Sequence, residues 1–281
     1  PNLMHEIARL REETFRAIGE GTGKNLDQDE FDNHFKQMIL WDKVQQRIAG
    51  CYRLGIGSEI IPKFGIKGFY VSTLVNIDES FSDHLAHTIE LGRAWVQPRY
   101  QSREAGVKAL FALDNLWDGL GAIFYNHPEV QYLIGKVTIY PAYDDLSRNL
   151  IYAYLRRYCN DEKGLFMPYH PIDISTEGQL LADDIFEGDD PVQNFHILMK
   201  AVRARGTTIP PMFSAYLNLT PRLRFFGNAV NDELSNVYES GIMVSIKDIY
   251  EDKKKRYIGS YLEYIGSLIK ARRNRLKATK K

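Results

Sequence analysis

Cysteine is scarce in this chain, and long apolar runs are missing from it. Its two cysteines, Cys51 and Cys159, form no CxxC pair, which excludes a disulfide framework and indicates free thiols in a reducing compartment. No apolar run reaches the roughly 20 residues that a membrane-spanning helix needs. The first residues also lack a signal-peptide pattern, so we expect a cytoplasmic protein. Because the chain starts at Pro1, we expect a further segment before it in the full gene product.

Metal-ligand spacing is also missing. The seven histidines fall into no ligating pattern, and we predict no metal site. The acidic run from Asp27 to Asp32 does not fit a calcium loop, which needs glycine at its sixth position and glutamate at its twelfth. Those positions hold Asp32 and Met38. The run is therefore either a solvated acidic turn or part of a site of another kind.

Net charge is zero, but the charges are unevenly distributed. Residues 253–281 contain eleven Lys or Arg and a single acid, Glu263, so the rest of the chain is acidic overall. Such a basic segment suits an anionic partner, which could be a membrane surface, an acidic protein or nucleic acid.

The pattern of elements centres on residues 88–96. Their β-branched and aromatic side chains predict a strand that Pro98 ends. Gly92, in mid-strand, is typical of a bulge. Glu90 and Arg93 would lie on opposite faces of a regular strand, whereas a bulge would bring them onto one face. The alternative is a surface strand with an incidental ion pair.

Periodicity predicts the other elements. We expect helices over residues 3–18, 104–120, 144–158, 191–205 and 253–278, and strands over 39–42, 48–54, 68–74, 131–140, 210–219 and 241–249. The order of strand, helix, strand and helix from 88 to 158 predicts two parallel strands. We expect one domain over 1–252 with an acidic, loop-like insertion at 160–190, and a basic C-terminal helix over 253–281.

Four stretches match one family pattern in order and spacing: Arg11-x-x-x-Phe15, Asp29-x-Phe31-Asp32, Gly50–Leu54 and Glu90–Arg93. Over about residues 3–250 they resemble the acyl-homoserine-lactone synthase and N-acyl amino acid synthase branch of the GNAT (N-acetyltransferase) superfamily. The nearest subgroup in resemblance is that of the ornithine-lipid and glycine-lipid N-acyltransferases, whose members often carry the label hemolysin. Homoserine-lactone synthases have a tryptophan soon after the position of Phe15; its absence here counts against S-adenosylmethionine as acceptor.

The resemblance implies an α/β (α+β) fold with a mixed, mostly antiparallel sheet that splays at the central strand and has helices on both faces. It implies no bound cofactor and a donor that is a fatty, 3-hydroxyacyl thioester on acyl carrier protein or coenzyme A. Arg103 and Gly106 keep part of the family's phosphate-binding loop, whereas Lys108 replaces its final small residue. That departure fits a protein-bound phosphopantetheine arm better than free coenzyme A.

The chemistry of thioester aminolysis suggests roles for residues of these stretches. Backbone N–H groups near Ala94, Trp95 and Val96 would stabilise the oxyanion of the reacting thioester. Glu90 would be the base or would position the amine, directly or through water, and Arg93 would pair with Glu90 or with the acidic turn. The predicted substrate-binding residues are the following: Asp29, Asp32, Arg53 and Arg11. The alternative for these charges is a structural network that joins the N-terminal helix to the sheet.

The function predicted from the resemblance is N-acylation of glycine or ornithine in membrane-lipid synthesis. Acyl carrier protein would be the protein partner, the basic C-terminus could contact an anionic inner membrane face peripherally, and no nucleic acid is expected. Two alternatives are a non-catalytic module that binds lipid or carrier protein and a membrane-damaging toxin. The toxin has no support beyond the label, because the sequence contains no pore-forming segment.

Overall fold

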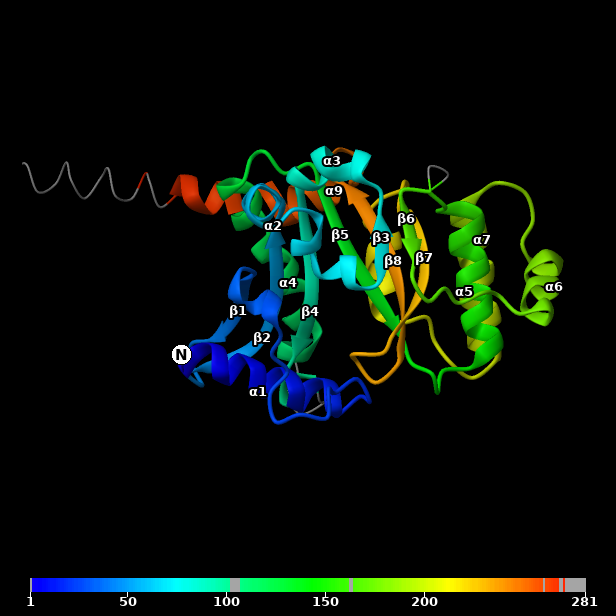
Figure 1. Ribbon diagram of the computed structural model, residues 1–281, viewed down its shortest axis with the longest axis horizontal. Coiled ribbons are helices and arrows are strands. Elements are labelled where there is room, and N and C mark those ends of the chain that lie inside the picture. The colour runs from blue at the N-terminus through cyan, green and yellow to red at the C-terminus, as the bar shows by residue number, and fades with distance from the viewer. Residues whose placement is uncertain (1, 102–106, 162–163, 260, 268–269, 271–281) are drawn as a thin grey trace, which may run out of the picture.

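The computed structural model describes residues 2–101, 107–161, 164–259, 261–267 and 270, with side chains from 107 to 115 left out. Its centre is a six-stranded sheet in the order β1-β2-β4-β5-β8-β7 (Figure 1). The strands are β1 Lys36–Asp42, β2 Arg47–Ile56, β4 Thr88–Val96, β5 Tyr132–Ile139, β7 Arg224–Asn231 and β8 Val237–Ser245. A second, two-stranded sheet pairs β3 Val75–Ile77 with β6 Phe166–Pro168.

The described helices cover both faces of the large sheet (Figure 1). They are α1 Asn2–Arg16, α2 Gly57–Phe64, α3 Ser82–Ala86, α4 Val107–Asn126, α5 Asp145–Tyr158, α6 Thr176–Ile185, α7 Pro191–Ala204, α8 Pro211–Leu217 and α9 Glu251–Lys254. Side-chain caps begin several of them. Asp144 accepts the N–H of Ser147 at the start of α5, and Asp190 caps α7 just before Pro191 at its first turn.

Three apolar core clusters lie on the two faces of the large sheet. One face packs against α4, α5, α7 and α8, and it includes Ile89 and Leu91 of β4. The other face packs against the segment 31–85, where Ile60 and Phe69 are buried, and against α1. Side chains that follow one another along a strand point to opposite faces of the sheet. Ile89 and Leu91 point toward α4, α5, α7 and α8, so Glu90, which stands between them in the sequence, points to the opposite face.

The expected bulge is present in β4, one residue after Gly92. Cys51 of β2 pairs with Trp95 and Arg53 pairs with Gly92, so Tyr52 lies opposite two residues, Arg93 and Ala94. Arg93 has a φ of 47°, in the left-handed region that non-glycine residues seldom occupy. The extra residue brings Arg93 onto the same face as Glu90, which confirms the geometric prediction.

The predicted parallel pair of strands is also confirmed, and it is short. β4 and β5 pair only from Thr88 to Leu91 and from Tyr132 to Gly135, and β5 continues its pairing with β8 alone. Figure 1 shows the two strands moving apart below this point. All other neighbouring strands of the large sheet are antiparallel, so the mixed, mostly antiparallel, splayed sheet agrees with the expectation.

Some predicted elements are wrong. Residues 68–74 form no strand but the short 3₁₀ helices Ile66–Gly68 and Tyr70–Thr73, because Phe69, Tyr70 and Val71 are all buried and do not alternate. Residues 210–219 contain α8, in which Phe213 and Tyr216 are buried three positions apart. The segment 160–190, expected to be loop-like, contains β6 and α6, and β7 was not predicted at all.

The start of the C-terminal segment docks on the body of the protein. Residues Lys255–Gly259 form a π-helical turn against α4, where the rings of Trp117 and Tyr257 have centroids 5.8 Å apart. Gly121 permits this approach, since a Cβ there would lie 2.4 Å from the carbonyl oxygen of Tyr257. Most of the basic residues beyond lie outside the described residues.

Candidate active site

A pocket of about 240 Å³ opens where β4 and β5 separate. The bulge of β4 forms one wall, and Lys136, Val137 and Thr138 of β5 form the other. The lining is completed by Phe15, Ile18, Glu20, Tyr52, Leu91, Tyr140, Pro210, Pro211, Met212, Leu234 and Glu239. A pocket that combines apolar walls with a few charged groups is the usual form of a site for a small substrate.

The bulge sets which part of β4 meets this pocket. Gly92, Arg93 and Ala94 line it. The side chains of Trp95 and Val96 instead pack into the cores on the two faces, at 4% and 8% exposure. Only the main chain of these two residues could therefore contribute to the predicted oxyanion site, and Ala94 is the member of the trio on the pocket wall.

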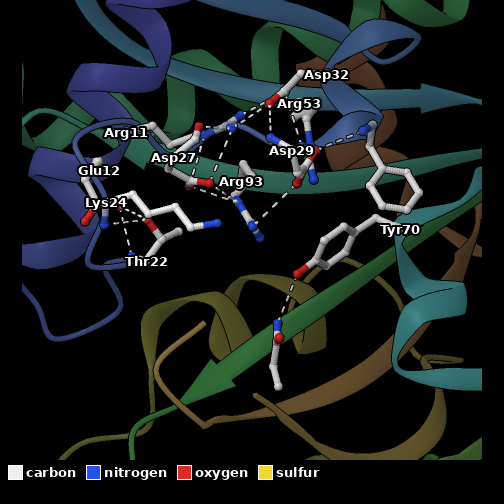
Figure 2. Close-up of polar contacts among 12 residues, drawn as sticks. Arg11, Glu12, Thr22, Lys24, Asp27, Asp29, Asp32, Arg53, Tyr70 and Arg93 are labelled. Carbon is white, nitrogen blue, oxygen red and sulfur yellow. Dashed lines mark hydrogen bonds and ion pairs between the residues drawn. The ribbon is translucent and has the colours of Figure 1, made fainter. Parts of the chain in front are cut away.

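Three arginines and three aspartates form a closed ring beside the bulge (Figure 2). Each arginine bridges two aspartates, and each aspartate is shared by two arginines. The nitrogen–oxygen distances are 3.0 Å for Arg11–Asp27, 2.8 Å for Arg11–Asp32, 2.6 Å for Arg53–Asp29, 3.2 Å for Arg53–Asp32, 3.0 Å for Arg93–Asp27 and 3.7 Å for Arg93–Asp29. The six formal charges cancel, as buried charges require.

Local structure puts the aspartates in place. Asp29 and Asp32 form a capping box around the 3₁₀ turn η1, Glu30–Asn33, in which each side chain accepts a backbone N–H of the turn. Burial alone would raise the pKa of Asp32. The hydrogen bonds and charge of Arg11, with the charge of Arg53, outweigh that effect and lower the pKa to about 2. Asp27, Asp29 and Asp32 of the acidic run thus belong to the ring, whereas Glu30 of the same run is exposed to solvent.

Arg11 and Arg53 are 0% and 1% exposed and do not line the pocket. Their position joins α1 and η1 to β2, as the structural-network alternative expected. Arg93 is the one arginine of the ring that also reaches the pocket wall. The structure brings all four predicted substrate-binding residues together, but in a layer behind the pocket.

Glu90 is buried, at 1% exposure, one layer behind the same wall. Its Oε1 accepts the backbone N–H of Val71 at 2.9 Å, and its Oε2 has no hydrogen-bond partner among the described residues. Burial raises the pKa of Glu90 to about 7, against the opposing charges of Lys136 and Arg53. A carboxyl group that titrates near neutrality is suited to accept a proton at physiological pH.

Tyr70 connects the ring to the second wall of the pocket. Its aromatic face lies 4.9 Å from the guanidinium carbon of Arg93 and 4.1 Å from Nζ of Lys136. Figure 2 shows Tyr70 beside the ring of arginines and aspartates. The side-chain amide of Asn231 donates to the Tyr70 hydroxyl at 3.2 Å and to the Glu239 carboxylate at 3.1 Å. Lys136 and Glu239 form an ion pair of 2.8 Å.

Several polar residues of the pocket were missed in the sequence, among them Glu20, Lys136, Tyr140 and Glu239. Lys136 had a signal, since it is a charged residue in the middle of the apolar strand β5. Glu20 had none, because it lies among the glycines that follow the first predicted helix, where no periodic pattern places a side chain. This loop is held by Glu12, whose carboxylate accepts the N–H and hydroxyl of Thr22 at 2.9 and 2.7 Å.

Other predicted positions have a simpler outcome. Arg103 and Gly106, predicted to bind the donor's phosphopantetheine, lie outside the described residues. Cys51 is fully buried, and burial raises the pKa of its thiol to about 12, so it is a neutral free thiol in the core.

A sheet that opens at a bulged central strand, with a charged pocket in the opening, is the architecture expected of a GNAT enzyme. A family model described as acetyltransferase (GNAT) domain matches residues 10–110. Two curated relatives, each named glycine N(alpha)-acyltransferase, come from Phocaeicola vulgatus and Bacteroides thetaiotaomicron. Each is 41% identical over 268 residues, which cover 94% of this chain and 82% or 79% of the relative. No solved structure matches the chain significantly.

The chain therefore belongs to the GNAT-family N-acyltransferases, and it is an amide-forming acyltransferase that uses an acyl donor. Within the described part of the chain, no helix has the length and apolar character needed to cross a bilayer.

Proposed function

We propose that the protein transfers a fatty acyl group, of the 3-hydroxyacyl type, from acyl carrier protein to the amino group of glycine, in the synthesis of an amino-acid membrane lipid. The observation that carries the proposal is the charged pocket between β4 and β5, in a chain 41% identical to two glycine N-acyltransferases. Ornithine is the second candidate acceptor.

The pocket offers what aminolysis of a thioester needs. The amine nitrogen attacks the carbonyl carbon, a tetrahedral oxyanion forms, and the carbon–sulfur bond breaks. The departing phosphopantetheine thiolate takes up the excess proton of the attacking nitrogen, which gives the amide and the free thiol. A backbone N–H at the bulge, at Ala94, is proposed to stabilise the oxyanion. Holding the amine and the thioester together in one cavity itself lowers the barrier by several kcal/mol.

The acceptor must lose a proton before it attacks, because an ammonium group has no free electron pair. Glu90 is proposed to accept this proton through water, since its carboxylate lies behind the β4 wall of the pocket and burial raises its pKa to about 7. Arg93 would hold the bulge in place through Asp27 and Asp29. The other ion pairs of the ring would keep Asp27 and Asp29 in position for Arg93; they are formed by Arg11 and Arg53 with Asp27, Asp29 and Asp32.

Acyl carrier protein is proposed as donor partner because it is acidic, whereas residues 253–281 of this chain are strongly basic. The same basic segment is proposed to allow peripheral contact with an anionic membrane face.

The test is an incubation with acyl carrier protein or coenzyme A thioesters and a panel of glycine, ornithine and other amino acids, with product detected by mass spectrometry. N-acylglycine formed from the carrier-protein thioester supports the proposal. If N-acylornithine is the main product, the acceptor is ornithine and not glycine. If the coenzyme A thioester is preferred, the donor is acyl coenzyme A and not the carrier-protein thioester. Binding of carrier protein without any amide product would instead favour the non-catalytic module.

A further inference from the structure

Glu20 is the carboxylate of the pocket that has no cation of its own. It is 6% exposed, lies on the pocket wall, and its backbone N–H is bound to the carbonyl of Phe15 at 2.8 Å. Its side chain hydrogen-bonds with Tyr140, a neutral phenol. No salt bridge to Glu20 is present among the described residues.

The other charges that line the pocket are already compensated. Arg93 belongs to the neutral ring with Asp27 and Asp29, and Lys136 is paired with Glu239 at 2.8 Å. Glu20 therefore leaves the pocket with one surplus negative charge when it is ionised. A buried, uncompensated carboxylate is costly, and a ligand cation would remove that cost.

A cation site next to a lysine matches one kind of ligand. Lys136 has three N–H donors, its Nζ lies 2.8 Å from a carboxylate oxygen of Glu239, and the centroid of the Tyr70 ring lies 4.1 Å from Nζ. Because Lys136 lines the pocket, its ammonium group is within the cavity's reach as a partner for an anionic group of the ligand. A positive group and a negative group in one small molecule are what an amino acid zwitterion presents.

We infer that Glu20, supported by Tyr140, binds the ammonium group of the acceptor amino acid, and that Lys136, held by Glu239 and Tyr70, binds its carboxylate. The inference deepens the proposed function and rests on it for the nature of the acceptor. It separates two carboxylates: Glu20 on the pocket wall binds and orients the acceptor, whereas Glu90, behind the wall, acts on the proton.

The test substitutes Glu20→Gln, which keeps the shape of the side chain and its contact with Tyr140 but removes the charge. The matched control is Glu13→Gln, the same change at a side chain of α1 that is 59% exposed. At saturating acyl donor, we expect the KM for glycine to rise by roughly tenfold or more in Glu20→Gln, as for the loss of a charged hydrogen bond. The KM for the donor, and both constants in Glu13→Gln, should stay unchanged.

Acceptor analogues test the Lys136 half of the subsite. Glycinamide keeps the ammonium group and lacks the carboxylate, so the wild type should use it at least roughly tenfold less well than glycine. In Glu20→Gln this preference for a carboxylate should persist, because Lys136 is untouched. Equal use of glycine and glycinamide by the wild type would overturn the assignment of Lys136.

Calorimetric titration of glycine into the protein without donor separates the inference from the proposed function. Binding by the wild type that weakens in Glu20→Gln supports the subsite even in a protein that makes no acylglycine, in which case only the proposed reaction fails. Acylglycine production with an unchanged KM for glycine in a folded Glu20→Gln variant supports the reaction and overturns the subsite.

Discussion

Leu91 of β4 and Gly135 of β5 form the last pair of the parallel ladder at the centre of the sheet. Immediately beyond them the strands separate and the pocket begins. Gly135 also leaves room for the hydroxyl of Tyr216, which lies 3.0 Å from where a Cβ would be and 3.4 Å from the hydroxyl of Tyr52. The site thus exists because the sheet stops pairing at this point, next to a bulge that displaces β4.

Arg11→Ala should strongly destabilise the protein, because it leaves Asp27 and Asp32 buried without one of their two cations. We expect a loss of about 3–5 kcal/mol in the free energy of unfolding, measured by urea denaturation. Arg9→Ala is the control, since Arg9 lies on the same helix with a side chain that is 45% exposed, and it should cost less than about 1 kcal/mol. A stable Arg11→Ala enzyme with a raised KM for glycine would instead place Arg11 in substrate binding.

Glu90→Gln should change how stability depends on pH. Burial raises the pKa of Glu90 from 4.5 to about 7, so the folded state favours the protonated form. The stability that Glu90 contributes is fully present below pH 4.5 and is lost as the pH rises to about 7, a change of about 3 kcal/mol. Urea unfolding at about pH 5 and pH 8 should show wild type losing stability relative to Glu90→Gln.

The same variant tests the proposed role of Glu90 in the reaction. In wild type, kcat should rise through a pKa near 7 as Glu90 ionises, and this rise should vanish in Glu90→Gln together with most of the turnover. Glu13→Gln provides the control for both measurements. Full turnover with an unchanged pH profile in Glu90→Gln would remove Glu90 from the mechanism.

Gly50→Ala should disturb the bulge without touching a charged residue. A Cβ at Gly50 would lie 2.6 Å from the carbonyl oxygen of Trp95, so β4 must move just after Arg93 and Ala94. We expect a loss of about 1–3 kcal/mol in stability and a lower kcat in the protein that remains folded. Gly241→Ala, where the nearest atom would be 3.6 Å away, should change neither. Unaltered kcat in Gly50→Ala would mean that the bulge geometry is not used in the reaction.

The sequence allowed prediction of the strands and helices whose pattern is local. The 88–96 strand, its bulge and its parallel partner could be foreseen because Gly92, Pro98 and the following helix lie close together in the chain. The strand prediction for residues 210–219 was wrong because their apolar run fits a strand as well as a short helix. Pro210 and Pro211 favour the helix, since they form the N-cap and first residue of α8. The strand prediction for residues 68–74 was wrong because the N–H of Val71 is donated to the Glu90 carboxylate and not to a neighbouring strand.

The site could be foreseen only in part, for a similar reason. The spacing of Arg11, Asp29, Asp32, Arg53 and Arg93 matches a family pattern, but their closed ring appears only when α1, η1, β2 and β4 come together. Glu20, Lys136 and Glu239 come from segments more than a hundred residues apart. No local pattern joins them, and the pocket between the separated strands is what brings them into one place.

The central claim is that acyl transfer occurs in the pocket between β4 and β5, and filling that pocket tests it most directly. Thr138 lines it from β5, and Thr138→Trp should block it, whereas Thr176→Trp on exposed α6 serves as the control. The measurement is the rate of N-acylglycine formation from acyl carrier protein thioester and glycine, with folding checked by circular dichroism. The account predicts a rate lower by about a hundredfold or more for folded Thr138→Trp and an unchanged rate for Thr176→Trp. Full turnover by the folded, pocket-filled variant would contradict it.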